Sequence, residues 1–444
     1  MNEYIILKSV KPINETLNFI PDNKDILIHK ESGIIEKIGR EIDVKNADVV
    51  NHYEDCLVMP GFIDPHVHFR YPGKEEAEDW NTGSLAALSA GITTVLDMPN
   101  NSPAIIDEKS LQIKLAHIRE KSRINYGVFG GLTSGNMDFL LGNKDIKAIK
   151  VYMASTTGDL LINKIQNLNF SDQRKVFSFH AEDEQIIKSN EAAIGKITTP
   201  WQHSEIRSEA SALKAVREVI EIYKKTRGNF HIAHVSTVAE IRELQNSGVS
   251  FECAPHHLFC STDNYNHGGF LWKCNPPLRN PETQKLMIEA LHEEKIQMIA
   301  TDHAPHTLAD KEMKEKLPAS GIPSLEVGTH FILNEMAKGR ISIPYAARIL
   351  STNSARRFQI EKRGEVKEGF FADLAIVDTQ KEWTFQQDSI FSKCGWSPFL
   401  NNRFSAKVIA TFVNGREYQT NTLYQLQKTK SIIKKDDALL VHQV

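Results

Sequence analysis

Two histidines, His66 and His68, are separated by one residue at the end of an apolar segment, in the run Pro-Gly-Phe-Ile-Asp-Pro-His-Val-His-Phe-Arg that begins at Pro60. Side chains alternate along a β-strand, so positions i and i+2 share a face. Both imidazoles would then point the same way, as two ligands of one metal ion require. The H-x-H pair alone is a weak signal, because two partly exposed histidines at a strand end give the same pattern.

Four other predicted strands end in, or close to, an ionisable side chain. These residues are Lys150, His180, His234 and Asp302. Burying such a group at the end of an apolar strand is costly unless the group is paired or bound to metal. Five strands with the same feature therefore favour one shared site. His231 is three residues before His234, points the opposite way, and is expected to be structural.

Lys150 differs from the other candidates because a protonated amine cannot ligate a metal. A lysine that has reacted with CO2 carries an anionic carbamate with two oxygens, which could bridge two cations. An isolated lysine would more simply be a surface residue or a salt-bridge partner. The adjacent pair His256 and His257 also invites a ligand role, but a packed loop is the favoured interpretation.

The elements that must position these side chains are predicted from the hydrophobic pattern. Eight apolar segments have strand character: 61–68, 93–98, 124–129, 146–152, 176–180, 230–235, 249–254 and 297–302. Segments with helical spacing lie between most of them, and residues 210–226 form the clearest one. Alternating strands and helices indicate an α/β fold with a parallel sheet, and eight of each predict a (β/α)8 barrel of the TIM type. In such barrels the active site lies at the carboxyl ends of the strands.

Both ends of the chain are rich in short strands. Residues 25–29 and 33–39 have this character near the N-terminus, and 372–378 and 407–415 near the C-terminus, where Asn-Gly predicts a turn. We therefore expect a small β-sandwich domain to be built from both chain ends. The predicted domains are residues 1–55 plus 370–444 for the sandwich and 56–369 for the metal-dependent barrel.

Composition narrows the class of protein. The 444 residues carry a formal net charge of -3, so no basic excess favours a nucleic-acid partner. The N-terminus lacks the pattern of a signal peptide, and no run approaches the roughly 18 apolar residues that span a membrane. The five cysteines are an odd number without a CxxC pair, which predicts reduced thiols and a cytoplasmic protein.

The segment 309–320 follows the last predicted strand and is strongly charged between residues 310 and 316. It is expected to be a polar, mobile loop that could lie over the barrel mouth as a lid. A solvated loop or helix start without a gating role is the alternative.

Six ordered motifs resemble the dihydroorotase family of the amidohydrolase superfamily, and the resemblance covers nearly the whole chain. The motifs are Pro60–Arg70, Met98-Pro-Asn100, His180-Ala-Glu182, Ala233-His-Val-Ser236, Asn275-Pro-Pro-Leu-Arg279 and Thr301-Asp-His-Ala-Pro-His306. The last is the most specific. One departure is Tyr71, where many family members have glutamate, and it is expected to change only local loop packing.

The resemblance implies two zinc ions per chain. Asp302 would share one ion with the H-x-H pair, the second ion would lie between the two single histidines, and a carboxylated lysine would bridge them. The implied ligands are His66, His68, Lys150, His180, His234 and Asp302.

The resemblance also implies a cyclic, imide-like substrate that bears one carboxylate. Arg70 can pair with a carboxylate through two parallel hydrogen bonds. Asn100 and His306 would contact the same carboxylate, and Asn275 would lie near the ring. The expected partner is this small molecule, with no nucleic acid and no membrane, and a homo-oligomer is left open.

The implied activity is reversible interconversion of dihydroorotate and N-carbamoyl-L-aspartate in de novo pyrimidine biosynthesis. A hydroxide that bridges the metals would attack the ring carbonyl, and Asp302 would carry the proton to the leaving nitrogen. One alternative is an allantoinase or a dihydropyrimidinase-type cyclic amidohydrolase. A further alternative is a non-catalytic scaffold homologue.

Overall fold

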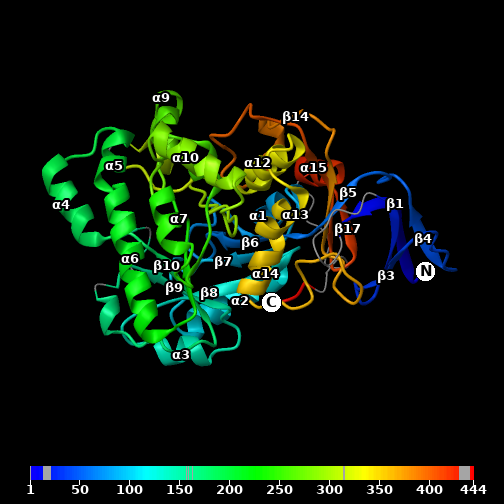
Figure 1. Cartoon of the computed structure of the whole chain (residues 1–444), viewed down its shortest axis with the longest axis horizontal. Coiled ribbons are helices and arrows are strands. Elements are labelled where there is room, and N and C mark those ends of the chain that lie inside the picture. The colour runs from blue at the N-terminus through cyan, green and yellow to red at the C-terminus, as the bar shows by residue number, and fades with distance from the viewer. Residues whose placement is uncertain are drawn as a thin grey trace.

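The centre of the molecule is a curled parallel sheet (Figure 1). The computed structural model describes residues 2–13, 22–156, 158, 160–162, 164–313, 316–429 and 441–444. The seven strands follow one another in the order β12-β11-β10-β9-β8-β7-β6, and every pair is parallel. The strands are β6 (Phe62–Val67), β7 (Ile92–Asp97), β8 (Asn125–Gly131), β9 (Ala148–Tyr152), β10 (Val176–His180), β11 (Phe230–Ile232) and β12 (Ser250–Phe251).

The eighth predicted strand, 297–302, closes the barrel but does not form a regular strand. Single parallel bridges join Cys253 to Ile299 on one side and Val67 to His303 on the other. These bridges connect the two outer strands of the seven-stranded sheet through the same segment. The barrel prediction is therefore confirmed, although the eighth segment of the barrel is not a regular strand.

Asp64 explains the irregularity. Its buried carboxylate accepts hydrogen bonds from the amide of Thr301 at 3.1 Å and from the Thr301 hydroxyl at 2.5 Å. Asp302 then adopts a left-handed backbone with a φ of 46°, which interrupts a β ladder. Burial raises the pKa of Asp64 to about 6.

Helices cover the outside of the barrel (Figure 1). The predicted helix 210–226 is observed as Glu209–Thr226, whose buried face includes Val216, Val219 and Ile220. Between β9 and β10, the described residues contain only the one-turn 3-10 helix η1 (Ile165–Asn167) in place of an α-helix. The helices are α1 (Trp80–Ser89), α2 (Glu108–Lys121), α3 (Met137–Gly142), α4 (Glu184–Ile194), α5 (Pro200–Ile206), α6 (Glu209–Thr226), α7 (Val238–Leu244), α8 (Pro255–Phe259), α9 (Tyr265–Gly268), α10 (Pro281–His292), α11 (Leu308–Glu312), α12 (Leu325–Ala337), α13 (Ile343–Ala347), α14 (Asn353–Arg357) and α15 (Thr420–Thr429).

The two chain ends combine in a second sheet, as predicted. β5 pairs in parallel with β1 and antiparallel with β13, so the N-terminal strands join the C-terminal strands at the β5–β13 pair. The predicted Asn-Gly turn joins β16 to β17, with positive φ at both Asn414 and Gly415. The strands of this sheet are β1 (Tyr4–Pro12), β2 (Lys24–His29), β3 (Ile35–Gly39), β4 (Ala47–Val50), β5 (Leu57–Pro60), β13 (Leu374–Asp378), β16 (Lys407–Val413) and β17 (Arg416–Gln419).

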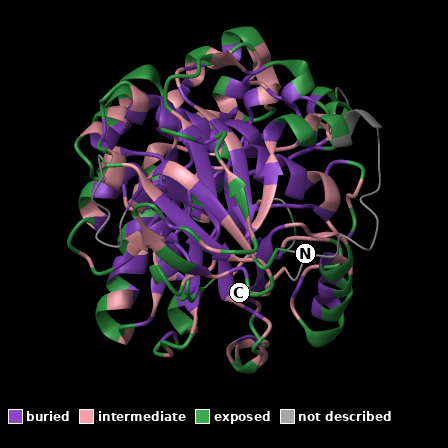
Figure 2. Ribbon diagram, turned by 90° about the vertical axis from the view of Figure 1, so that its right-hand side faces the viewer, coloured by how far each residue is buried: buried purple, intermediate pink, exposed green. Residues whose placement is uncertain are grey.

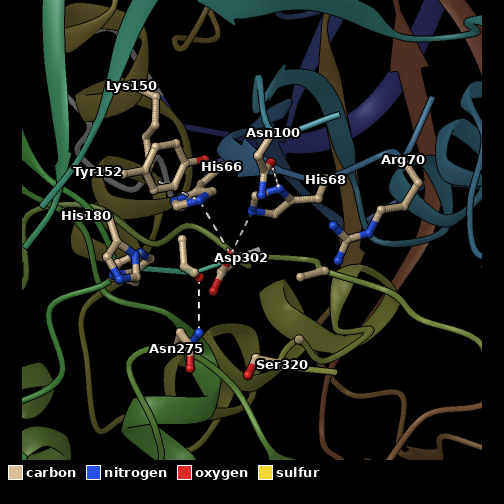
Figure 3. Close-up of a pocket in the computed structure, with 14 residues that line it drawn as sticks. His66, His68, Arg70, Asn100, Lys150, Tyr152, His180, Asn275, Asp302 and Ser320 are labelled. Carbon is tan, nitrogen blue, oxygen red and sulfur yellow. Dashed lines mark hydrogen bonds and ion pairs between the residues drawn. The ribbon is translucent and has the colours of Figure 1, made fainter. Parts of the chain in front are cut away.

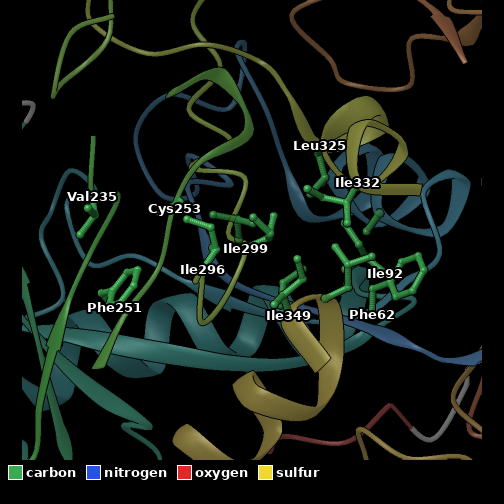
Figure 4. Packing of buried hydrophobic residues seen from close by; sticks show 14 of the residues in the cluster. Phe62, Ile92, Val235, Phe251, Cys253, Ile296, Ile299, Leu325, Ile332 and Ile349 are labelled. Carbon is green, nitrogen blue, oxygen red and sulfur yellow. The ribbon is translucent and has the colours of Figure 1, made fainter. Parts of the chain in front are cut away.

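Burial follows these layers. Figure 2 shows buried strands in the interior and exposed residues concentrated on the surrounding helices and loops. The barrel core packs strand residues such as Phe62 and Ile92 against Leu325 and Ile332 of α12 (Figure 4). A separate cluster that includes Leu7, Ile26, Leu374 and Phe412 fills the small domain. Among the described residues, no helix is long and apolar enough to cross a bilayer.

Candidate metal and substrate site

One pocket gathers the predicted chemistry at the carboxyl ends of the barrel strands (Figure 3). The space among its side chains is about 380 Å³, part of which is open to solvent. Nine of the ten predicted site residues line it: His66, His68, Arg70, Asn100, Lys150, His180, His234, Asn275 and Asp302. The tenth, His306, lies in contact with Arg70, with its Nε2 atom 3.0 Å from Arg70 Nη2.

The H-x-H pair and Asp302 form the first ligand group. The Nε2 atoms of His66 and His68 lie 3.4 Å and 3.3 Å from the same oxygen, Asp302 Oδ1. His66 lies on β6 and His68 follows the strand directly, and both rings point into the barrel mouth (Figure 3). Lys150, on β9, places its Nζ 3.5 Å from His66 Nε2. All four side chains are buried.

The two single histidines form a second group beside the first. His180 Nδ1 lies 2.9 Å from His234 Nε2. The ring centroid of His234 lies 5.3 Å from that of His66, so the two groups are neighbours. Within the described residues, Nδ1 of His234 is buried and has no hydrogen-bond partner.

Three of these histidines are oriented so that one ring nitrogen directs its lone pair into the pocket. The outer nitrogen of each ring meets an oxygen acceptor: His66 Nδ1 lies 2.6 Å from Glu252, His68 Nδ1 2.8 Å from Asn100, and His180 Nε2 2.7 Å from Glu182. Donation from the outer nitrogen places the lone pair on the inner one, as metal ligation requires. The residues present therefore fit a metal ion.

The electrostatic environment also favours the protonation states that metal binding requires. Burial lowers the pKa of His68 to about 3, so its ring is neutral at neutral pH. Burial opposes ionisation of Asp302, but His66 and His68 outweigh it and hold the pKa of that carboxyl well below its usual range. Burial lowers the pKa of Lys150 to about 8, so a large fraction of its amine is unprotonated near that pH. Neutral imidazoles and an ionised carboxylate are the forms that bind metal.

Glu252 is a functional residue that sequence reasoning missed. Its carboxylate accepts from His66 and, through the other oxygen, lies 3.0 Å from Nε2 of His231. His231 thus lies behind the site and helps to orient it. The available signal was an acidic residue inside the apolar segment 249–254, which is unusual unless it is paired.

Arg70 is locked beside the ligand groups. Its Nε donates to the carbonyl oxygen of Pro305 at 2.8 Å, and His306 Nε2 lies 3.0 Å from both its Nη2 and the carbonyl oxygen of Ser320. Burial and the Arg70 charge hold the pKa of His306 well below its ordinary value, so His306 is neutral. A guanidinium and a neutral imidazole at one wall of the pocket suit an anionic substrate group.

Three site residues adopt strained backbone conformations. The φ angles are 58° at Arg70, 38° at His234 and 46° at Asp302. A residue other than glycine pays roughly 1–3 kcal/mol for such a conformation, which persists only where the surrounding structure imposes it. Strain at three positions of one pocket supports a functional role for that pocket.

The opposite wall contains further residues that sequence reasoning missed. Tyr152 is two residues after Lys150 on β9 and therefore faces the same pocket. Its hydroxyl is buried and has no hydrogen-bond partner among the described residues. Asn275 is oriented by His203, 2.9 Å from its Oδ1, and donates to the Thr156 hydroxyl at 3.1 Å.

The predicted loop 309–320 forms part of the pocket through its C-terminal end. Ser320 and Gly321 line the cavity. Lys311 is buried and donates from Nζ to the carbonyl oxygens of Lys273, Ala319 and Gly321 at 2.9, 3.0 and 2.9 Å. Residues 314–315 of the predicted lid lie outside the described residues, and closure over a substrate stays a prediction.

Comparison with known proteins shows the family to which the chain belongs. The sequence profile described as "Amidohydrolase family" matches residues 57–418, which include every site residue above. The chain belongs to the amidohydrolase family. Among its curated relatives are the dihydroorotases of Methanosarcina acetivorans, 33% identical over 84% of this chain and 84% of the relative, and of Methanosphaera stadtmanae, 32% identical over 95% and 98%.

Solved structures show that the amidohydrolase fold extends over almost the whole chain. L-Hydantoinase from Arthrobacter aurescens aligns with a TM-score of 0.86 and 22% identity, covering 93% of this chain and 95% of that one. Dihydropyrimidinase from Brevibacillus agri aligns with a TM-score of 0.84 and 22% identity, covering 93% and 94%. These likenesses establish the barrel with its additional sheet, and the buried imidazole and carboxylate groups offer this amidohydrolase a metal site.

Proposed function

We propose that this amidohydrolase is a dihydroorotase, which interconverts dihydroorotate and N-carbamoyl-L-aspartate. The observation that carries the proposal is the position of Arg70 beside the ligand groups, held by Pro305 and in contact with His306. A metal site alone suits any cyclic amide hydrolase. A buried, oriented guanidinium next to it selects a ring that bears a carboxylate, and the curated relatives are named dihydroorotases.

Substrate binding is assigned to the two walls of the pocket. Arg70 would pair with the substrate carboxylate, with Asn100 and His306 beside it. Asn275 would lie against the ring, since its amide is oriented by His203 on one side and by Thr156 on the other. An arginine in this position gives a geometric as well as an electrostatic match to a carboxylate.

The proposed metal content is two zinc ions per chain. Imidazole and carboxylate donors suit zinc, and the two neighbouring ligand groups provide two positions. When bound, such ions lower the pKa of coordinated water to roughly 7 and polarise a carbonyl oxygen. Lys150, as a carbamate, would bridge the two positions. The proposed ligands are His66, His68, Lys150, His180, His234 and Asp302.

Asp302 is the proposed catalytic residue because it is ionised and lies inside the first ligand group. It would accept the proton of the attacking water and pass it to the ring nitrogen as the carbon–nitrogen bond breaks. In the reverse direction the same carboxylate would return the proton, and the ring closes with loss of water. Ring closure is the direction that would supply pyrimidine synthesis, which we place in the cytoplasm, where thiols stay reduced.

Parallel turnover measurements with dihydroorotate, dihydrouracil and allantoin test the proposal. Dihydrouracil has the same ring without the carboxylate, so it isolates the contribution of Arg70. We expect measurable turnover with dihydroorotate and a kcat/KM at least a hundredfold lower with the other two. Comparable or faster turnover of dihydrouracil or allantoin would reassign the enzyme to another branch of the cyclic amidohydrolases.

A further inference from the structure

A second group of metal-type side chains lies outside the pocket. His256 and His257 lie in the first turn of α8, and Cys274 precedes Asn275 in the chain. One ligand atom of each of the three lies within 4.8 Å of the other two, and all three side chains are buried. None of them lines the pocket described above. The proposed reaction therefore does not account for them.

Several ring nitrogens of these two histidines have no hydrogen-bond partner among the described residues. His257 Nε2 lies 3.0 Å from the carbonyl oxygen of Pro276, so Nε2 carries the proton and Nδ1 presents a lone pair. Within the described residues, His257 Nδ1 and both ring nitrogens of His256 are buried without a hydrogen-bond partner. A buried polar group left unsatisfied costs roughly 1–3 kcal/mol. Unsatisfied nitrogens on two adjacent buried histidines indicate a missing ligand.

We propose that His256, His257 and Cys274 bind one additional zinc ion. Two imidazoles and one sulfur are a donor set that zinc prefers. The bond from His257 to Pro276 is the outer contact that commonly orients a metal-bound histidine. The three ligand atoms lie within 4.8 Å of one another, which is close enough for one ion to contact all three, and binding would release the thiol proton of Cys274.

The position of this site gives the ion a structural role. The ion would tie the start of α8 to the segment that carries Asn275, which lines the substrate pocket. The ion would stabilise the folded state by giving a partner to His257 Nδ1 and to one ring nitrogen of His256.

A sulfur signature separates this site from the catalytic one, because the six proposed catalytic ligands include no cysteine. The zinc-loaded wild-type protein should show a sulfur neighbour at about 2.3 Å in zinc X-ray absorption. Protein loaded with cobalt(II) alone should show a thiolate-to-metal charge-transfer band. Absence of both signals from the wild-type protein would overturn the proposal, whatever the outcome of the turnover assays.

Matched variants assign the signal to one cysteine. Cys274→Ala should lose the sulfur signals and one equivalent of zinc, while Cys253→Ala, which alters another fully buried cysteine outside the group, should keep both. An unchanged zinc content in Cys274→Ala would also overturn the proposal. If Cys274→Ala does not fold, His256→Gln should show the same loss of one equivalent of zinc. The spectra of the wild-type protein test the proposal without any variant.

Discussion

The carboxylate of Glu252 lies 2.6 Å from Nδ1 of His66, and both side chains are almost fully buried. The two residues are 186 positions apart in the chain. This contact sets the tautomer of His66 and directs its Nε2 toward Asp302 and Lys150. The ligand group is thus supported from behind by a charge that never reaches the pocket.

Removing this support should weaken metal binding before it affects the fold. For Glu252→Ala we expect the zinc affinity to fall roughly 10–100-fold, as is typical when the outer partner of a metal-bound histidine is lost. Chelator competition measures the affinity. Glu240→Ala is the matched control, because Glu240 is also a buried carboxylate but binds Ser236 and Thr237 instead. Equal affinities of the two variants would contradict the role of Glu252.

Asp302→Asn should separate chemistry from structure. The amide cannot accept the proton, so turnover of dihydroorotate should fall roughly 10²–10⁴-fold, the usual contribution of a general acid or base. The thermal midpoint should stay close to that of the wild type. Metal content must be measured in the same sample, since a variant that retains its metals yet keeps more than a tenth of wild-type turnover would refute the assignment.

Arg70→Lys tests recognition of the carboxylate. Lysine keeps the positive charge but cannot form two parallel hydrogen bonds. We expect the KM for dihydroorotate to rise about tenfold or more, which corresponds to about 1.4 kcal/mol of binding free energy, with a smaller effect on kcat. Binding of orotate, followed by calorimetry, should weaken in parallel. The assignment fails if orotate binds the variant as tightly as the wild type.

Tyr152→Phe tests a contact that the pocket offers to the substrate. The Tyr152 hydroxyl is buried without a partner among the described residues, so a substrate oxygen is its natural acceptor. Loss of one such hydrogen bond, about 0.5–1.5 kcal/mol, should lower kcat/KM roughly 2–10-fold. The free protein should become no less stable, because the variant removes an unsatisfied polar atom. A destabilised variant with unchanged kcat/KM would show that the hydroxyl serves the fold.

The state of Lys150 predicts how activation depends on pH. Only the unprotonated amine reacts with CO2, and its fraction grows as the pH rises through a pKa of about 8. Reactivation of metal-free protein by zinc and bicarbonate should therefore be faster at pH 8.5 than at pH 6.5. Mass spectrometry under native conditions would detect the added CO2, and Lys150→Ala is the control. A reactivation rate that is the same at both pH values would argue against carboxylation.

Local rules in the sequence predicted the barrel and the candidate metal ligands, whereas Asn100, Asn275 and His306 were named through the family resemblance. The alternation predicted for residues 61–68 placed His66 and His68 on one face, and both rings point into the pocket although β6 ends at Val67. Parallel strands in a closed barrel bring their carboxyl ends to one mouth, so Lys150 and Asp302 could be assigned to the same site from different parts of the chain.

Only the tertiary structure showed which hydrogen-bond partners orient these site residues. The bonds of Glu252 to His66 and of His203 to Asn275 join distant segments whose partners no local pattern specifies. The last barrel segment is irregular because the buried Asp64 binds Thr301, a contact made only when the barrel closes. Periodicity reports which face a side chain takes, whereas its partner depends on how separate elements pack in three dimensions.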